Sequence, residues 1–124
     1  MSKSEVKSSR KKKKVKTIIE RLKKRLTIAV LTDKIPPHIR HLRERGVYDD
    51  FSPVITSVEI GTTKKSPSAF TIAALRLSLT PQQCILVDDK NENVETSKAT
   101  GMKGIFFTSP HQLEQDIVRL GLLN

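Results

Sequence analysis

Apolar residues in this 124-residue chain follow two patterns, short continuous runs and longer stretches with helical spacing. Continuous runs of three to five mostly apolar residues indicate buried strands. They predict strands at residues 27–31, 54–56, 84–87 and 104–107. Apolar residues three or four positions apart, flanked by start and stop signals, predict helices around these runs. The helices are expected at residues 16–25, 36–45, 67 to no further than 80, 91–100 and 110–120.

Proline, glycine and serine mark the ends of several of these helices. Pro36 and Pro67 stand where a first turn would begin, and a helix needs no N–H donor there. Ser109 and Gln112 have the spacing of a capping box. Gly46 closes one helix, since glycine readily adopts the left-handed conformation that follows a last turn. Strand and helix therefore alternate four times, which predicts an α/β fold, a Rossmann-like doubly wound parallel sheet with right-handed crossovers.

Positive charge is concentrated at the N-terminal end. Residues 1–26 hold 12 Lys and Arg against 2 Glu, whereas residues 27–124 hold 11 basic and 11 acidic residues. Residues 1–15 have too few apolar side chains to offset the entropy of ordering, so they are expected to form a disordered basic tail ahead of a body at residues 16–124. Residues 3–16 could bind polyanions without sequence preference, or could be a solvated tail only.

The remaining composition points to an ordinary cytosolic protein. Cys84 is the only cysteine, which excludes an intramolecular disulfide, and its place in an apolar run favours a buried core thiol over a reactive one. No stretch reaches the roughly 18 apolar residues of a membrane span. A cytoplasmic location is therefore expected.

Polar side chains follow two of the predicted strands. Asp88 and Asp89 come at the end of the third strand, with Asn93 in the next turn, and Thr32 ends the first strand. Lys64 lies in a loop just before a helix. The carboxyl ends of strands are where open α/β sheets place ligands. A hydroxyl, an ammonium and a carboxylate pair are suited to a phosphoryl group and its Mg²⁺ ion.

In order and spacing, these residues resemble motifs of the haloacid dehalogenase-like hydrolases, mostly phosphatases that work through a phosphoaspartate. The stretch Val30-Leu31-Thr32-Asp33 resembles the second motif, whose hydroxyl and following amide bind phosphoryl oxygens. Ser57 to Lys64 resembles S-x-E-x-G-x-x-K, which implies that Lys64 neutralises nucleophile and phosphate. The usual K-P-D-P is Lys64-Lys65-Ser66-Pro67 here, so either lysine could be the functional one.

The resemblance extends to the metal-binding motif. Asp88-Asp89 with Asn93 resembles the double-aspartate form of the fourth motif, which implies that the two aspartates bind Mg²⁺ and that Asn93 supports them. The first motif is missing, because no D-x-D occurs in the sequence. In the family this motif supplies the aspartate nucleophile, so the chain resembles the C-terminal part of a core domain. A weak or incomplete Mg²⁺ site and no hydrolysis by this chain alone are expected.

Two other classes of function could use these residues. A non-enzymatic protein could use the same core to bind a phosphorylated small molecule or a protein partner, with the tail adding affinity for nucleic acid. A phosphoacceptor receiver domain also uses an acid pair, a threonine and a lysine, but it places the acid pair first, whereas here Asp88-Asp89 comes last.

The missing strand also has a structural consequence. The family places it between the strands that correspond to residues 27–31 and 84–87. Its absence predicts either a gap or direct pairing of those two strands, and a gap would favour low stability, self-association or a strand-donating partner.

Overall fold

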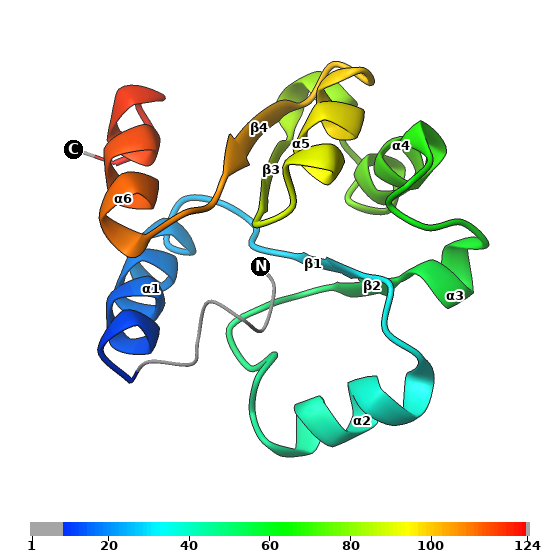
Figure 1. Cartoon of the computed structure of the whole chain (residues 1–124), viewed down its shortest axis with the longest axis horizontal. Coiled ribbons are helices and arrows are strands. Elements are labelled where there is room, and N and C mark those ends of the chain that lie inside the picture. The colour runs from blue at the N-terminus through cyan, green and yellow to red at the C-terminus, as the bar shows by residue number, and fades with distance from the viewer. Residues whose placement is uncertain (1–8, 124) are drawn as a thin grey trace.

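The computed structural model describes residues 9–123, and their side chains from residue 13 onward. Helices and strands alternate along the chain, as Figure 1 shows. The helices are α1 (Ser9–Leu22), α2 (Pro36–Glu44), α3 (Ser57–Ile60), α4 (Pro67–Arg76), the 3-10 turn η2 (Pro81–Gln83), α5 (Asn91–Lys98) and α6 (Pro110–Arg119). The strands are β1 (Val30–Thr32), β2 (Val54–Thr56), β3 (Ile85–Asp88) and β4 (Lys103–Phe106). The predicted α/β class is confirmed.

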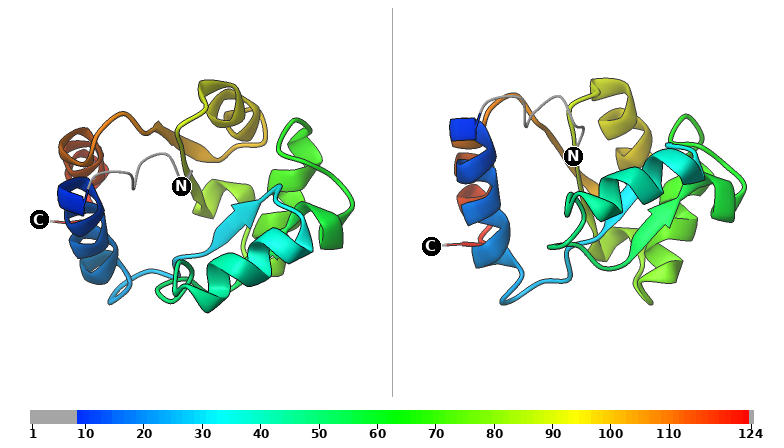
Figure 2. Two further views of the ribbon diagram at one scale, coloured as in Figure 1. Left: turned by 60° about the horizontal axis from the view of Figure 1, so that its bottom comes forward. Right: turned by 90° about the horizontal axis from the view of Figure 1, so that it is seen from below.

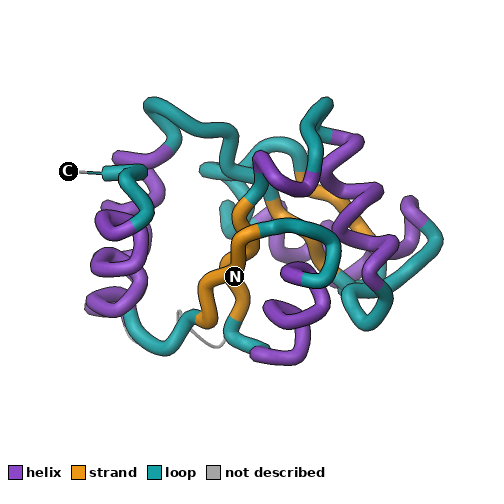
Figure 3. The backbone as a smooth tube through the Cα atoms, turned by 90° about the horizontal axis from the view of Figure 1, so that it is seen from above, coloured by secondary structure: helices purple, strands orange, loops and turns teal. Residues whose placement is uncertain are grey.

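The four strands form two separate parallel pairs rather than one sheet. β1 pairs with β2, with Leu31 opposite Ile55, and β3 pairs with β4, with Val87 opposite Ile105. In the part of the chain that the structure describes, no hydrogen-bonded ladder joins β1 to β3. The two pairs are the orange segments of Figure 3. Of the two predicted arrangements, a gap or direct pairing of these strands, direct pairing is thus not seen among the described residues.

Apolar side chains gather in two clusters that bridge the strand pairs. The smaller one is built on Phe70 and Ala74 of α4, both with no exposed surface, and on Met102. Leu31 of β1 and Leu86 of β3 both pack against it. This cluster therefore holds the two strand pairs together on the side of α4, without backbone hydrogen bonds between them.

The larger cluster joins the chain ends. Helices α1 and α6 lie side by side, as Figures 1 and 2 show. Their apolar faces meet through Val15, Ile18, Leu113 and Ile117, each at most 4% exposed. Burial of these side chains is the main favourable term for docking α1.

Helix α1 begins inside the segment predicted to be disordered. The low apolar content of residues 1–15 argued for disorder, but Val15 extends the stripe of Ile18, Ile19 and Leu22. Packing of that stripe stabilises a lysine-rich helix back to Ser9. The rest of the expected tail, residues 1–8, lies outside the described residues.

Most other boundaries agree with the predicted ones within a few residues, but two short elements were not predicted. The Ser109–Gln112 capping box is present at the start of α6. Thr56 and Glu59 form a second capping box at α3, where the Thr56 hydroxyl accepts from the Glu59 N–H at 3.2 Å. Thr80 and Gln83 form another at η2. Among the described residues, no helix is both long and apolar enough to span a bilayer.

Gly104 of β4 is in close contact with α5. A Cβ atom at this position would lie 2.7 Å from Cγ1 of Val94 and 3.3 Å from Cε of Lys98. Val94 is 1% exposed, so it has little room to move. The absence of a side chain at Gly104 therefore lets α5 pack directly on β4.

Candidate functional site

The candidate site lies at the carboxyl ends of β1 and β3. A pocket of about 310 Å³ opens there, between the two strand pairs. It is lined by all six residues singled out from the sequence: Thr32, Asp33, Lys64, Asp88, Asp89 and Asn93. They come from four elements, the ends of both strands, the loop before α4 and the first turn of α5. The fold thus brings together side chains that are up to 61 positions apart in the sequence, from Thr32 to Asn93.

Asp88 is the centre of the polar network. Its side chain is buried, and both of its oxygens accept hydrogen bonds. Oδ2 accepts from Nζ of Lys64 at 3.1 Å and from Nδ2 of Asn93 at 3.1 Å, while Oδ1 accepts from the Lys90 N–H at 2.9 Å. An ionised carboxylate in this position is stabilised by one full charge and two dipoles. The network holds Asp88 in one orientation.

Lys64, rather than Lys65, points into the pocket. The Lys64 side chain is 18% exposed where it meets Asp88, whereas Lys65 is exposed to solvent. The backbone N–H of Lys64 also donates to Oδ1 of Asp33 at 3.3 Å, which links the loop before α4 to the end of β1. The geometry therefore places one of the two candidate ammonium groups at the strand ends, beside Asp88.

Tyr48 is a pocket residue that the sequence did not suggest. It follows α2 in a turn and lines the pocket with Thr32, to whose side chain it is hydrogen-bonded. Partial burial raises the pKa of Tyr48, an effect that the Thr32 hydrogen bond and the charge of Arg43 partly oppose. The phenol is therefore protonated at neutral pH. No spacing or motif marks this residue, so only the fold could reveal its position.

The carboxylates in the pocket do not form a complete metal site. Mg²⁺ prefers six oxygen ligands in near-octahedral geometry. Three of the roughly four lone-pair positions of Asp88 already accept protein hydrogen bonds. The described residues contain no group of three or more His, Cys, Asp and Glu side chains placed to hold a metal ion. The residues present therefore do not fit Mg²⁺ without further ligands.

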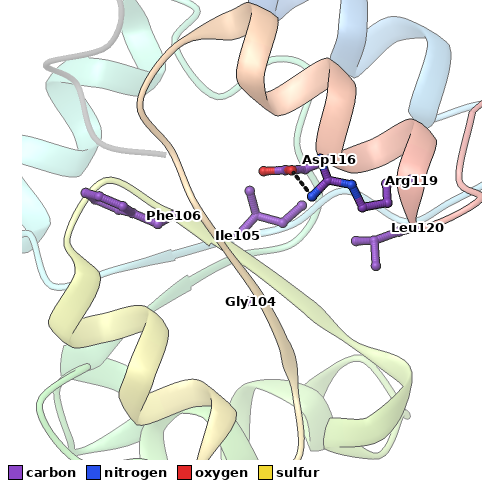
Figure 4. Close-up of a pocket in the computed structure, with 6 residues that line it drawn as sticks. All are labelled: Gly104, Ile105, Phe106, Asp116, Arg119 and Leu120. Carbon is purple, nitrogen blue, oxygen red and sulfur yellow. Dashed lines mark ion pairs between the residues drawn. The ribbon is translucent and has the colours of Figure 1, made fainter.

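A second pocket, of about 270 Å³, lies between β4 and α6 and is shown in Figure 4. It is lined by apolar groups of Ile105, Phe106 and Leu120 and by an ion pair. The pair joins Asp116 to Nη1 of Arg119 at 3.2 Å, on the surface of α6. The two charged side chains that line this pocket are paired with each other, so the candidate site remains the one at the strand ends.

Comparison with known proteins decides the family. Residues 6–101 match the haloacid dehalogenase-like hydrolase family. The chain belongs to the haloacid dehalogenase-like hydrolases. Members of this family generally use Mg²⁺. The predicted resemblance is thereby confirmed, and the match covers α1 and the whole candidate site.

Relatives and solved structures agree with this assignment. The chain is 29% identical over 84 residues to a phosphoglycolate phosphatase of Salmonella paratyphi A, an alignment covering 67% of this chain and 33% of the phosphatase. The chain spans about a third or less of the length of the first curated relatives it matches.

Two solved structures share the fold. An uncharacterized protein of Corynebacterium glutamicum superposes with a TM-score of 0.82 at 21% identity, covering 96% of this chain and 89% of the other. A hydrolase of Streptococcus pneumoniae superposes with a TM-score of 0.72 at 17% identity, covering 84% of this chain and 55% of the other. At such identities the two structures support the fold alone.

Proposed function

We propose that this chain is a core of phosphatase lineage that binds a phosphorylated small molecule at the strand ends and does not hydrolyse it alone. The observation that carries the proposal is the pocket itself, where Thr32, Lys64 and Asp88 converge although the sequence contains no D-x-D. The pocket has groups that bind a phosphoryl oxygen. Because the sequence has no D-x-D, we expect none of the carboxylates that line it to act as the family's nucleophile.

Binding of the anion would centre on Lys64 and Thr32. The Thr32 hydroxyl already accepts the Lys34 N–H at 3.2 Å and is hydrogen-bonded to Tyr48, so an oxygen of the ligand would compete with the phenol for its proton. The Lys64 ammonium has three donors, of which Asp88 takes one. A phosphate could therefore bind Lys64 without breaking the ion pair. Asp89 and Asp33 would oppose a dianion, so affinity should be modest.

The same geometry argues against an aspartate from this chain acting as nucleophile. Asp88 is held by three donors, and Asp33 accepts the Lys64 N–H. A carboxylate that attacks phosphorus must present a lone pair to the ligand, and each of these bonds lowers its nucleophilicity. Because the residues do not complete a Mg²⁺ site, we expect any Mg²⁺ bound at Asp88 and Asp89 to be held weakly.

The binding role can be tested by comparing two neighbouring lysines. The Lys64→Met variant should bind inorganic phosphate roughly 10- to 100-fold more weakly, as expected from loss of a charge-assisted hydrogen bond of about 1.5–3 kcal/mol. Lys65→Met removes the same charge outside the pocket and should change affinity by less than about threefold. Tyr48 is the only tyrosine and the chain has no tryptophan, so intrinsic fluorescence reports on the pocket. Equal losses in both variants would contradict the assignment of Lys64.

Catalysis is tested with the unmodified chain. With Mg²⁺ and a generic aryl phosphate, its turnover should not exceed that of the Asp89→Asn variant, because neither protein has a free nucleophile. Release of the aryl alcohol is followed by absorbance. Clear Mg²⁺-dependent turnover that Asp89→Asn abolishes would overturn the proposal, and would point to Asp33 as the attacking group.

A second function is favoured by α1. Its apolar stripe is buried, while Lys13, Lys14 and Lys16 are exposed. Lysines held on one docked helix form a cationic surface that can bind a polyanion without reading its sequence. We therefore also propose weak binding of nucleic acid by the N-terminal segment, and its test is given in the Discussion.

A further inference from the structure

We propose that Thr32 acts on a bound phosphoryl group through Tyr48, whose phenol donates the hydrogen bond to the ligand. This role of Tyr48 rests on the proposed phosphate binding and adds to it a residue outside the motifs recognised in the sequence. The two side chains line the same pocket and are hydrogen-bonded to each other. Tyr48 would thus be a second donor to the ligand, beside the Lys64 ammonium.

The turn after α2 fixes Tyr48 at the pocket. Gly46 adopts a φ of +76°, a left-handed conformation that favours glycine, and the Val47 N–H donates to the Leu42 carbonyl at 3.0 Å. The Tyr48 carbonyl accepts the Phe51 N–H at 3.0 Å, and Phe51 packs against the larger apolar cluster. Because the backbone is held on both sides of Tyr48, the phenol should lose little further freedom when a ligand binds.

The Thr32 hydroxyl is already engaged on two sides. Its oxygen accepts the Lys34 N–H at 3.2 Å, and its single proton can be donated to the phenol oxygen of Tyr48. A hydroxyl that accepts an N–H is polarised and becomes a stronger donor to the next group. Thr32 is 6% exposed and Tyr48 is half-buried, so the tyrosine is the more accessible of the two side chains. With Thr32 donating to Tyr48, the phenol proton is left for an oxygen of the ligand.

The positive charge near the phenol favours an anion there. Burial raises the pKa of Tyr48, and the Thr32 hydrogen bond and the charge of Arg43 act in the opposite direction. The phenol is protonated at neutral pH, so it can donate. Arg43 lies on α2, and a cation close enough to favour a phenolate also favours a phosphoryl oxygen beside the phenol. Asp33 and Asp89 line the same pocket and oppose this attraction, which keeps the affinity modest.

Donors from separate elements would then share the ligand. Lys64 lies in the loop before α4 and Tyr48 in the turn after α2, and both line the pocket of about 310 Å³. A phosphoryl group has several acceptor oxygens, so it can accept from the ammonium and the phenol together. The Lys34 N–H, the Thr32 hydroxyl and the Tyr48 hydroxyl form a series of donors that ends on the ligand. Each bond in such a series strengthens the next, which makes Thr32 a positioning residue for Tyr48.

The phosphate affinities of two single variants of the full chain test which hydroxyl meets the ligand. Titrations with inorganic phosphate are followed by amide NMR shifts. Tyr48→Phe keeps the ring and should weaken binding at least about tenfold, as expected for a lost hydrogen bond to a charged group. Thr32→Val removes a donor to the phenol and should weaken binding less, by roughly threefold. If Thr32 met the ligand directly, the order would be reversed, because Tyr48→Phe would release the threonine proton.

A carbon label on the phenol gives a second measurement. Tyr48 is the only tyrosine, so ¹³C at its Cζ atom gives a single NMR signal that responds to hydrogen bonding of the hydroxyl. Phosphate should move this signal in the original chain, with the affinity that the amide shifts give. The signal should move at higher phosphate concentrations in Lys64→Met, and as in the original chain in Lys65→Met. In Thr32→Val it should already be displaced without phosphate, since the bond to the phenol is gone.

Several results would overturn the role of Tyr48 and leave phosphate binding intact. These are equal affinities of Tyr48→Phe and the original chain, a loss in Thr32→Val as large as that in Tyr48→Phe, or a phenol signal that saturating phosphate does not move. Absence of phosphate binding by the original chain would overturn both this role and the proposed function. Thr32→Val leaves the Lys34 N–H without its acceptor, so circular dichroism checks its fold. If it does not fold, Tyr48→Phe and the labelled original chain still decide.

Discussion

Replacing Phe70 by alanine is expected to lower the free energy of unfolding by about 3–5 kcal/mol. Phe70 has no exposed surface, and its ring lies in the cluster on which both Leu31 and Leu86 pack. Because no backbone ladder joins the two strand pairs within residues 9–123, this cluster is one of their main connections. The cost should therefore lie at the upper end of that range. Urea unfolding of both proteins, followed by circular dichroism, measures the difference.

A matched change on the same helix provides the control. Leu75 is 73% exposed on α4, so Leu75→Ala should shift stability by no more than about 0.5 kcal/mol. Both variants remove apolar atoms from α4, and only burial differs between them. A loss below about 1 kcal/mol for Phe70→Ala would show that the α4 cluster does not hold the strand pairs together.

Binding of the chain to nucleic acid should weaken by at least about 10³-fold between 50 and 200 mM salt, if six or more phosphates are neutralised. The basic residues of 1–26 carry the whole net charge, so binding would come from counterion release and should be insensitive to sequence. Fluorescence anisotropy of a labelled RNA, over a salt series, measures the slope.

Deleting residues 1–14 should abolish this binding. The deletion begins the chain at Val15 and so retains the buried stripe of Ile18, Ile19 and Leu22. The double variant Lys98→Gln, Lys103→Gln removes two exposed charges elsewhere and should bind nearly as well as the original chain. If the deleted chain kept its affinity, a surface on the neutral body would have to be responsible.

Local signals in the sequence predicted much of the site. Thr32 and Asp88 each end an apolar run, and the carboxyl ends of parallel strands meet, so their proximity follows from the pattern alone. The choice between Lys64 and Lys65 does not follow from it. Only the path of the loop before α4 turns Lys64 toward Asp88.

Long-range packing explains what the sequence did not predict. Too few apolar residues lie near Val15 in its own segment to predict a helix. The residues that pack with it from elsewhere in the chain lie in α6 and β4. Helix α3 was missed although Thr56 and Glu59 have capping-box spacing, because four residues are too few to show an apolar periodicity. Tyr48 reaches Thr32 through a turn whose shape no local pattern specifies.

The close contact at Gly104 links the shape of β4 to the polarity of the pocket. Val94 fills the place of a side chain at Gly104, and Val94 directly follows Asn93, whose amide holds Asp88. A methyl group at this position would push the first turns of α5 outward and lengthen the Asn93–Asp88 bond. An alanine at Gly104 should therefore change the charge balance around Lys64, which lies in the loop before α4 and not on the mutated strand. A screen for variants with altered anion affinity should include this buried position, although no atom of Gly104 lines the pocket.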